Sequence, residues 1–300
     1  MMIFTCRDTF EDMMTCIYDA WEWALQPGHS HEELTLLREP VSQTSLFCEY
    51  RHTKHVDPAP GEVSKCDKVI RTIKQRISYD AFVGVYYAAM NCDEDALDTI
   101  YRFLRLGFRV GPSVSEMLTE PCVQRMMELR RNTGNEAHFS REFARFSQIT
   151  NPNTSSSEQG SLYVCHLSPK NNIVFITAQH FTDRMPSEHW MIIDDERRFA
   201  VVHPASAGTF RNKESIRSET SSVLSEPDGS EMYIRYLSED EMSILQHTED
   251  IEDDYSSLWR AFHDAISIKQ RENYKCQRNM FPIWMRKHAT EFRKRSPRTS

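Results

Sequence analysis

Apolar residues recur every three or four positions through much of the first half of the chain. This spacing places them on one side of an α-helix, where they can be buried together. The stretch 79–90 is apolar nearly all round, which indicates a helix buried on every side. The predicted helices of this half cover residues 10–25, 62–77, 79–90, 95–108 and 115–132.

The second half has a different pattern, in which short runs of β-branched and aromatic residues alternate with turn formers. Such runs are typical of strands. Residues 190–193 and 199–202 flank Asp194-Asp195-Glu196-Arg197, which predicts a hairpin. The remaining predicted strands cover residues 2–6, 43–50, 145–149, 162–167 and 232–237, and the remaining predicted helices cover 171–184, 254–268 and 282–293.

These elements predict an α+β fold with a mainly helical N-terminal half, a mixed sheet region and C-terminal helices. A chain of 300 residues suits one large domain or two smaller ones. The polar segment 151–160 is a candidate boundary between a helical region, 1–150, and a sheet-containing region, 151–300, although both can belong to one integrated domain. Residues 206–230 are rich in Ser and Glu and indicate a loop or an insert.

Composition narrows the classes of function. The net charge of −8 argues against a wholly basic nucleic-acid binder, but a local basic surface remains open, since acids gather in 238–254 and basic residues dominate from 260 onwards. The eight cysteines form no Cys-x-x-Cys pair, which favours reduced thiols over a zinc or iron–sulfur site. Phosphate-binding glycine loops are absent, which disfavours an ATPase or a dinucleotide enzyme. We expect no metal and no cofactor.

The sequence contains neither a signal-peptide pattern nor a membrane-spanning segment. The first residues lack the apolar core of a signal peptide, and no run approaches the roughly 20 apolar residues of a membrane span. We therefore expect a cytoplasmic protein.

Candidate chemistry concentrates in the run 136–146, which combines an acid, an imidazole, guanidinium groups and aromatic rings. Glu136 and His138 are candidate catalytic residues, as a base and its orienting acid. Two residues apart, they share a face on a strand but not on a helix. The alternative is a structural network of ion pairs and hydrogen bonds.

Two pairs of basic residues have the spacing of one helix face. Arg141 and Arg145 are candidate phosphate ligands, and His180 with Arg184 repeats the same spacing, with His180 as a third catalytic candidate. We expect His138, Arg145, His180 and Arg184 to line one cleft, within roughly 8 Å of each other. The alternative is salt bridging to the many acids, or a buried histidine beside an arginine.

Further basic residues are candidate nucleic-acid contacts, because cations near aromatic rings are typical of single-strand binding. They are Arg197, Arg271, Lys275 and Arg278. The acids 194–196 have the carboxylates that Mg²⁺ binds, but a hairpin turn is the preferred interpretation.

Five runs, taken in order, resemble a bacterial family of unknown biochemical function assigned to DNA metabolism or DNA repair. The resemblance extends over roughly residues 2–292. The runs are Phe10-Glu11 with Tyr18-Asp19-Ala20; Glu136, His138, Phe143, Arg145 and Phe146; His180, Phe181 and Arg184; Trp190, Ile192, Asp194 and Arg197; and Leu258-Trp259, Phe262, Ile266, Ile268, Arg271, Asn273, Pro282 and Trp284.

In that family the domain is encoded beside a radical-SAM protein or is fused to a uracil-DNA-glycosylase-like domain. The resemblance therefore implies a DNA-binding accessory protein whose partner carries the chemistry. The water-activating segment of the glycosylases and the Cys-x-x-x-Cys-x-x-Cys of radical-SAM enzymes are both absent here. The alternatives are a nucleic-acid-processing enzyme with a His/Arg/Glu pocket and a protein-interaction scaffold.

Overall fold

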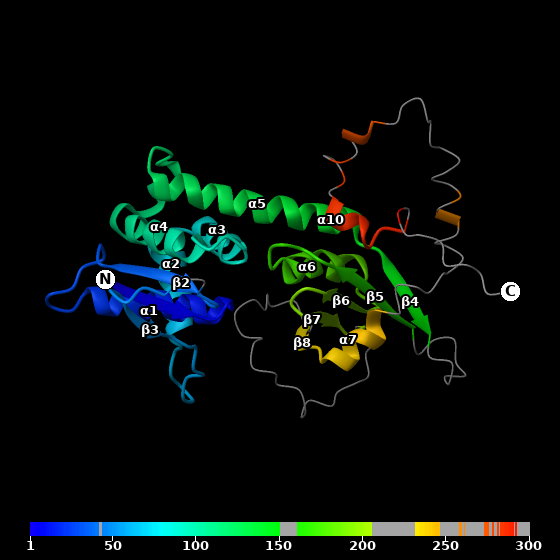
Figure 1. The fold of residues 1–300 in the computed structure, drawn as a ribbon, viewed down its shortest axis with the longest axis horizontal. Helices are drawn as coiled ribbons and strands as arrows, with labels where there is room; N and C mark the ends of the chain where they lie inside the picture. Colours follow the sequence, from blue (N-terminus) through cyan, green and yellow to red (C-terminus); the bar gives the residue numbers. More distant parts are fainter. Residues whose placement is uncertain are drawn as a thin grey trace. The chain divides into compact units, whose positions relative to one another are not determined.

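The computed structural model describes residues 1–41, 44–150, 161–205 and 232–246, together with residues 258, 259, 261, 273–275, 278, 281, 283–290 and 292. The chain forms two compact units, Met1–Asn135 and Glu136–Ser300. The boundary falls inside one long helix, α5 (Pro121–Phe143). The two units are described separately below (Figure 1).

Unit 1 contains a three-stranded parallel sheet in the order β2-β1-β3. The strands are β1 (Met2–Cys6), β2 (Leu34–Arg38) and β3 (Glu49–His52). All five residues of β1 are buried, as expected for a central strand covered on both faces. The sequence pattern predicted β1 but not β2, and it placed the third strand at 43–50, several residues before β3 begins.

Helices make up most of unit 1, as predicted. They are α1 (Phe10–Ala24), α2 (Lys65–Arg76), α3 (Tyr79–Ala89), α4 (Ala96–Val110), the short 3₁₀ helix η1 (Gly111–Glu116) and the first part of α5. Thr9, Ser64 and Ser78 cap α1, α2 and α3, since each side chain accepts a hydrogen bond from a backbone N–H in the first turn. The predicted helix 115–132 was misplaced: η1 takes up its start, and α5 continues through Phe143.

Unit 2 is built on a five-stranded mixed sheet in the order β4-β5-β6-β7-β8. Strands β5 and β6 are parallel and are connected through α6, whereas the other neighbouring strands are antiparallel. The predicted hairpin between β6 and β7 is confirmed. The elements are β4 (Phe146–Thr150), β5 (Ser161–Leu167), α6 (Val174–Arg184), β6 (His189–Asp194), β7 (Phe199–His203), β8 (Tyr233–Tyr236) and α7 (Glu239–Gln246).

Helices cover both faces of this sheet (Figure 1). On one face, Val174, Ala178 and Phe181 of α6 pack with Trp190 and Val201. On the other face, Met242 of α7 packs with a second set of strand residues, namely Val164, Ile193 and Ala200. Because neighbouring side chains on a strand point to opposite faces, both sets come from the same strands. The α+β fold class is thus confirmed.

A third apolar cluster anchors the C-terminal segment of unit 2. Phe281, Met285 and Ala289, in and around α10 (Ile283–Arg286), pack against Phe139 and Phe143 of α5. The rings of Phe143 and Phe281 stack with centroids 4.1 Å apart. These aromatics of the run 136–146 therefore form core. Most of the predicted helix 254–268 lies outside the described residues.

Two further observations concern the described part of the chain alone. Its seven cysteines are all free thiols. None of its helices combines the length and the apolar character needed to cross a membrane.

Candidate functional site

Glu136 is buried near the start of unit 2 and holds a loop. Its carboxylate oxygens accept hydrogen bonds from the backbone N–H groups of Lys170 (2.8 Å) and Asn171 (2.9 Å). These donors belong to the loop between β5 and α6. A carboxylate satisfied in this way is a brace for the loop, because both of its oxygens are already engaged.

His138 lies two residues along α5 but is exposed. Its Nε2 lies 3.1 Å from Oε1 of Glu142, one helical turn on. Positions two apart on a helix face different directions, so Glu136 and His138 have separate partners. The proposed pairing of a catalytic base with its orienting acid is therefore replaced by a brace and a surface ion pair.

His180 of α6 lies among cations. Its pKa is lowered from 6.5, first by burial and then by the positive charges of Arg184 and Arg141, while Asp183 opposes the shift. Three of the sequence-predicted residues thus come together, and we call Arg141, His180 and Arg184 the α5–α6 basic cluster.

The α5–α6 basic cluster is poor in acidic partners. Arg141 donates from Nε to the carbonyl oxygen of Ala137 at 3.2 Å. Within the described residues, neither Arg141 nor Arg184 forms an ion pair with a carboxylate. Clustered guanidinium groups without a carboxylate can bind an external anion, and phosphate suits their paired donors.

Arg145 is placed differently from the basic cluster. Its guanidinium donates to the carbonyl oxygens of Ala144 (3.2 Å) and Glu142 (3.4 Å) and lies 5.8 Å from the ring centroid of Trp259. Of the four residues expected to line one cleft, the electrostatic interactions group only His180 with Arg184, and Arg141 acts on the same imidazole.

Arg197 has a structural role in the β6–β7 hairpin. It forms an ion pair with Asp194 (3.0 Å) and donates to the carbonyl oxygens of Pro169 (3.2 Å) and Lys170. A guanidinium engaged in this way connects the hairpin to the loop after β5 and has little capacity left for a phosphate. Lys275 and Arg278 are exposed, and Arg271 lies outside the described residues.

Asp194 shapes the turn of the same hairpin. Its side chain is fully buried, and Oδ1 accepts from the backbone N–H groups of Glu196 and Arg197. Burial raises its pKa, while Arg197 opposes that shift. The acids 194–196 are therefore turn formers, and no group of three or more potential ligands within the described residues has the arrangement of a metal site.

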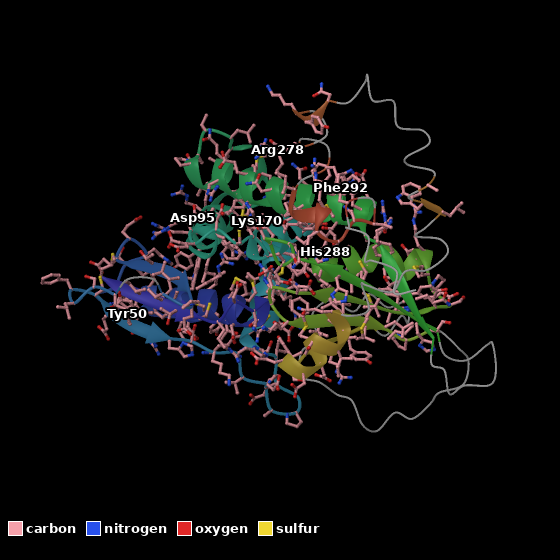
Figure 2. All side chains as sticks on the ribbon, turned by 45° about the vertical axis from the view of Figure 1, so that its right-hand side comes forward. Tyr50, Asp95, Lys170, Arg278, His288 and Phe292 are labelled. Atoms are coloured by element: carbon pink, nitrogen blue, oxygen red, sulfur yellow. The ribbon has the colours of Figure 1, made fainter. Side chains whose placement is uncertain are left out.

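A second polar group, not foreseen from the sequence, lies where β5 and β6 end. We call it the β5–β6 edge cluster, and His288 is labelled in Figure 2. Oγ of Ser168 lies 2.9 Å from Nε2 of His288 and 3.2 Å from Nζ of Lys287. Asp195 is next to these groups, with Oδ2 at 3.8 Å from both His288 Nε2 and Lys287 Nζ. The members are His166, Ser168, Asp195, Lys287 and His288.

Buried contacts hold the carboxylate of Asp195 in place. The other carboxylate oxygen of Asp195 lies 2.8 Å from Nδ1 of His166, and Nε2 of His166 lies 3.1 Å from the carbonyl oxygen of Leu245. His166 and Asp195 have side chains only 1% and 6% exposed. A carboxylate is rarely this buried unless it has polar partners, as Asp195 has here.

Parallel pairing explains the position of the edge cluster. Leu167 is in register with Asp194, so the residues that follow, Ser168 and Asp195, leave the sheet at the same edge. This is the edge at which α/β proteins commonly place their ligands. Lys287 and His288 lie directly after α10, about 120 residues further along the chain, and only their basic character was visible in the sequence.

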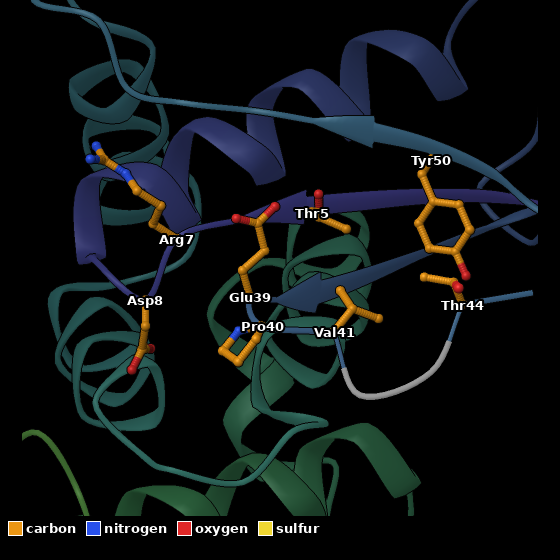
Figure 3. A pocket seen from close by; sticks show the side chains of 8 residues that line it. All are labelled: Thr5, Arg7, Asp8, Glu39, Pro40, Val41, Thr44 and Tyr50. Carbon is orange, nitrogen blue, oxygen red and sulfur yellow. The ribbon is translucent and has the colours of Figure 1, made fainter.

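Unit 1 has a cavity of its own, of about 650 Å³, beyond the carboxyl ends of β1 and β2 (Figure 3). Three of its charged side chains are already paired: Arg7 with Asp12, Asp8 with Arg38, and Glu39 with His52. Internal pairing leaves little net charge for a ligand. The lining residues are Thr5, Arg7, Asp8, Glu39, Pro40, Val41, Thr44 and Tyr50.

Comparison with known proteins gives a match to one family model. Neither the curated proteins nor the solved structures contain a match to this chain. A family model described as a domain of unknown function, DUF4130, matches residues 94–291, which include both polar clusters and begin inside unit 1. Since the match extends over more than half of the 300 residues, the chain belongs to the DUF4130 family.

Proposed function

We propose that this protein binds nucleic acid as an accessory factor in DNA metabolism or repair. The α5–α6 basic cluster is the observation that carries the proposal. It offers two guanidinium groups and an imidazole to an anion from two neighbouring helices of unit 2. Phosphate groups of a nucleic-acid backbone match these donors in charge and geometry.

Binding of an anion should also change the protonation of the imidazole. Burial, and then the charges of Arg184 and Arg141, lower the pKa of His180 from 6.5, so the ring is mainly neutral near pH 7. A bound phosphate supplies the opposite charge and favours protonation of the ring. Binding is therefore coupled to proton uptake by His180.

The partner in this proposal comes from the family resemblance described for the sequence. A radical-SAM protein, or a uracil-DNA-glycosylase-like domain, carries the redox or base-excision chemistry, and this chain holds the nucleic acid. The rival pocket enzyme, with Glu136 and His138 as its acid–base pair, has less support, since Glu136 is engaged by backbone N–H groups and His138 by Glu142.

Binding to labelled single-stranded and duplex oligonucleotides tests the proposal. Fluorescence anisotropy is measured across a salt series, because each neutralised phosphate contributes about 0.9 to the slope of log affinity against log salt for duplex DNA and about 0.7 for single strands. The double variant Arg141→Gln/Arg184→Gln should bind more weakly and lose roughly 1.4 (single strands) to 1.8 (duplex) from that slope, for two lost contacts.

The control variant Arg71→Gln/Arg131→Gln removes the same charge from two exposed arginines of unit 1. It should retain the slope of the unmodified protein. Equal losses in both variants would mean that net charge alone governs binding. An absence of binding at low salt would exclude nucleic acid as the ligand of the basic cluster.

A further inference from the structure

A nucleophile and a base are in contact in the β5–β6 edge cluster. Ser168 Oγ and His288 Nε2 are 2.9 Å apart, which is the separation required for a general base to take the serine proton. The serine is partly open to solvent, whereas His288 is buried. A substrate can thus approach the hydroxyl while the base stays in a fixed position.

The buried acid beside this pair suits the charge that proton transfer creates. Oδ2 of Asp195 lies 3.8 Å from Nε2 of His288, so its negative charge stabilises the imidazolium that forms there. His166 holds the opposite carboxylate oxygen at 2.8 Å and prevents rotation of Asp195 away from the pair. Asp195 and His166 act through His288 and are positioning residues.

Positive charge on the serine side selects the kind of substrate. Nζ of Lys287 lies 3.2 Å from Ser168 Oγ, and the exposed Lys170 follows two residues later in the same loop. An ammonium group beside the nucleophile attracts an anionic substrate and stabilises negative charge that develops on its oxygens. Phosphate esters meet this requirement better than neutral carboxylic esters.

We propose that Ser168 is an activated nucleophile toward phosphate esters, with His288 as its general base. The Ser168 Oγ–P bond forms as the bond from phosphorus to the leaving oxygen breaks. The serine proton passes to Nε2 of His288 and then to the leaving alkoxide. Water next attacks phosphorus and loses a proton to Nε2 of His288. The P–Oγ bond to Ser168 breaks as the phosphate product leaves, and His288 returns its proton to the serine oxygen.

This inference goes beyond the proposed function and is independent of it, because the site needs no nucleic acid to react. A fluorophosphonate probe tests the nucleophile directly on the full chain, with peptide mass spectrometry to locate the adduct. We expect modification of Ser168 in the unmodified protein and none in Ser168→Ala. The variant His288→Gln should react at least about 100-fold more slowly, as expected when a general base is lost.

Ser187→Ala, which removes an exposed serine elsewhere in unit 2, is the matched control and should be labelled at the normal rate. Hydrolysis of bis(p-nitrophenyl) phosphate compared with p-nitrophenyl acetate then tests the substrate class, and Lys287→Gln should weaken only the reaction with the phosphate ester.

An unmodified protein whose Ser168 does not react with the probe would overturn the proposal, whatever the variants do. Equal labelling of Ser168 in the unmodified protein and in His288→Gln would overturn it too. In either case the Ser168–His288 contact is a structural bond that holds α10, and thermal unfolding of Ser168→Ala would register its loss.

Discussion

Single residues with buried charge carry much of the organisation of unit 2. Glu136 is the clearest case, since its carboxylate satisfies two backbone N–H groups of the loop that also presents Ser168. His138, two residues away, pairs at the surface with Glu142. The same helix thus presents a buried carboxylate that accepts from backbone N–H groups and an exposed imidazole beside an exposed carboxylate.

Truncation of these two residues should have unequal effects. Glu136→Ala removes a charged acceptor from two N–H groups and should lower the free energy of unfolding by about 2–3 kcal/mol. Glu136→Gln retains an acceptor and should cost less. His138→Ala is the control and should stay within about 0.5 kcal/mol. Urea denaturation followed by tryptophan fluorescence measures all three, and equal losses would contradict the brace assigned to Glu136.

His180 provides a second test on the residue scale. Its pKa should lie below 6.5 and should rise in Arg184→Gln, because one of the nearby positive charges is then gone. The unfolded chain takes up this proton at higher pH than the folded chain does, so His180 lowers folded stability as the pH falls below 6.5. An NMR titration of the ring protons measures the pKa, and a value above 6.5 would contradict the basic cluster.

An ion pair connects two helices of unit 1. In unit 1, Arg130 of α5 donates to both carboxylate oxygens of Asp80, in the first turn of α3, at 3.0 and 2.8 Å. Both partners are largely exposed, so this bidentate pair links the two helices at modest energy.

Asp80→Asn should cost roughly 0.2–1 kcal/mol at pH 7 and less at high salt. Arg130 holds the pKa of Asp80 below 3.8, so the stabilisation is complete above that value and disappears as the pH falls through the lowered pKa. Denaturation curves at pH 7 and near pH 3 test this, with Glu94→Gln as an exposed control. A cost that persists in acid would rule out the ion pair as its source.

The chain contains one unit with a parallel sheet and helices and a second unit with a mixed sheet, and the boundary between them falls within α5. The DUF4130 match begins at residue 94, just before α4, and includes most of unit 2. Both polar clusters therefore belong to the family region, whereas the parallel sheet of unit 1 does not. Nucleic-acid binding and phosphate-ester chemistry are therefore proposed for unit 2.

Base chemistry on DNA should require the partner implied by the resemblance. The purified chain alone should leave uracil-containing and alkylated oligonucleotides unchanged, since its proposed sites address phosphate groups. Mixed with the radical-SAM or glycosylase-like partner, it should elute as a complex in size-exclusion chromatography. The partly buried Trp284 lies in the C-terminal region that we expect to make the contact, so Trp284→Ala should weaken that complex. Excision of uracil by this chain alone, with an authentic glycosylase as positive control, would contradict the accessory assignment.

The local sequence pattern was sufficient to predict those helices and strands whose own residues have a clear helical or strand periodicity. The helical spacing of residues 10–25, the polar turn 194–197 and the short β-prone runs of unit 2 predicted α1, the β6–β7 hairpin and most of the sheet. The strand β2 gave a weaker signal, because it is short and its order beside β1 depends on parallel pairing across the connection through α1. The bounds of α5 were predicted wrongly. The predicted start at residue 115 belongs to η1, and the helix continues to Phe143 through a run that was interpreted only as candidate chemistry.

The sequence by itself determined the α+β class, the hairpin and the concentration of basic residues near 141 and 184. Only the tertiary structure decided which of these residues meet. Helix geometry separates Glu136 from His138, and the packing of unit 2 gathers Arg141 with His180 and Arg184. Parallel pairing of β5 with β6 and the docking of α10 bring Ser168, Asp195 and His288 together. Sequence periodicity records which face of an element is buried, whereas contacts between distant segments depend on how those faces pack.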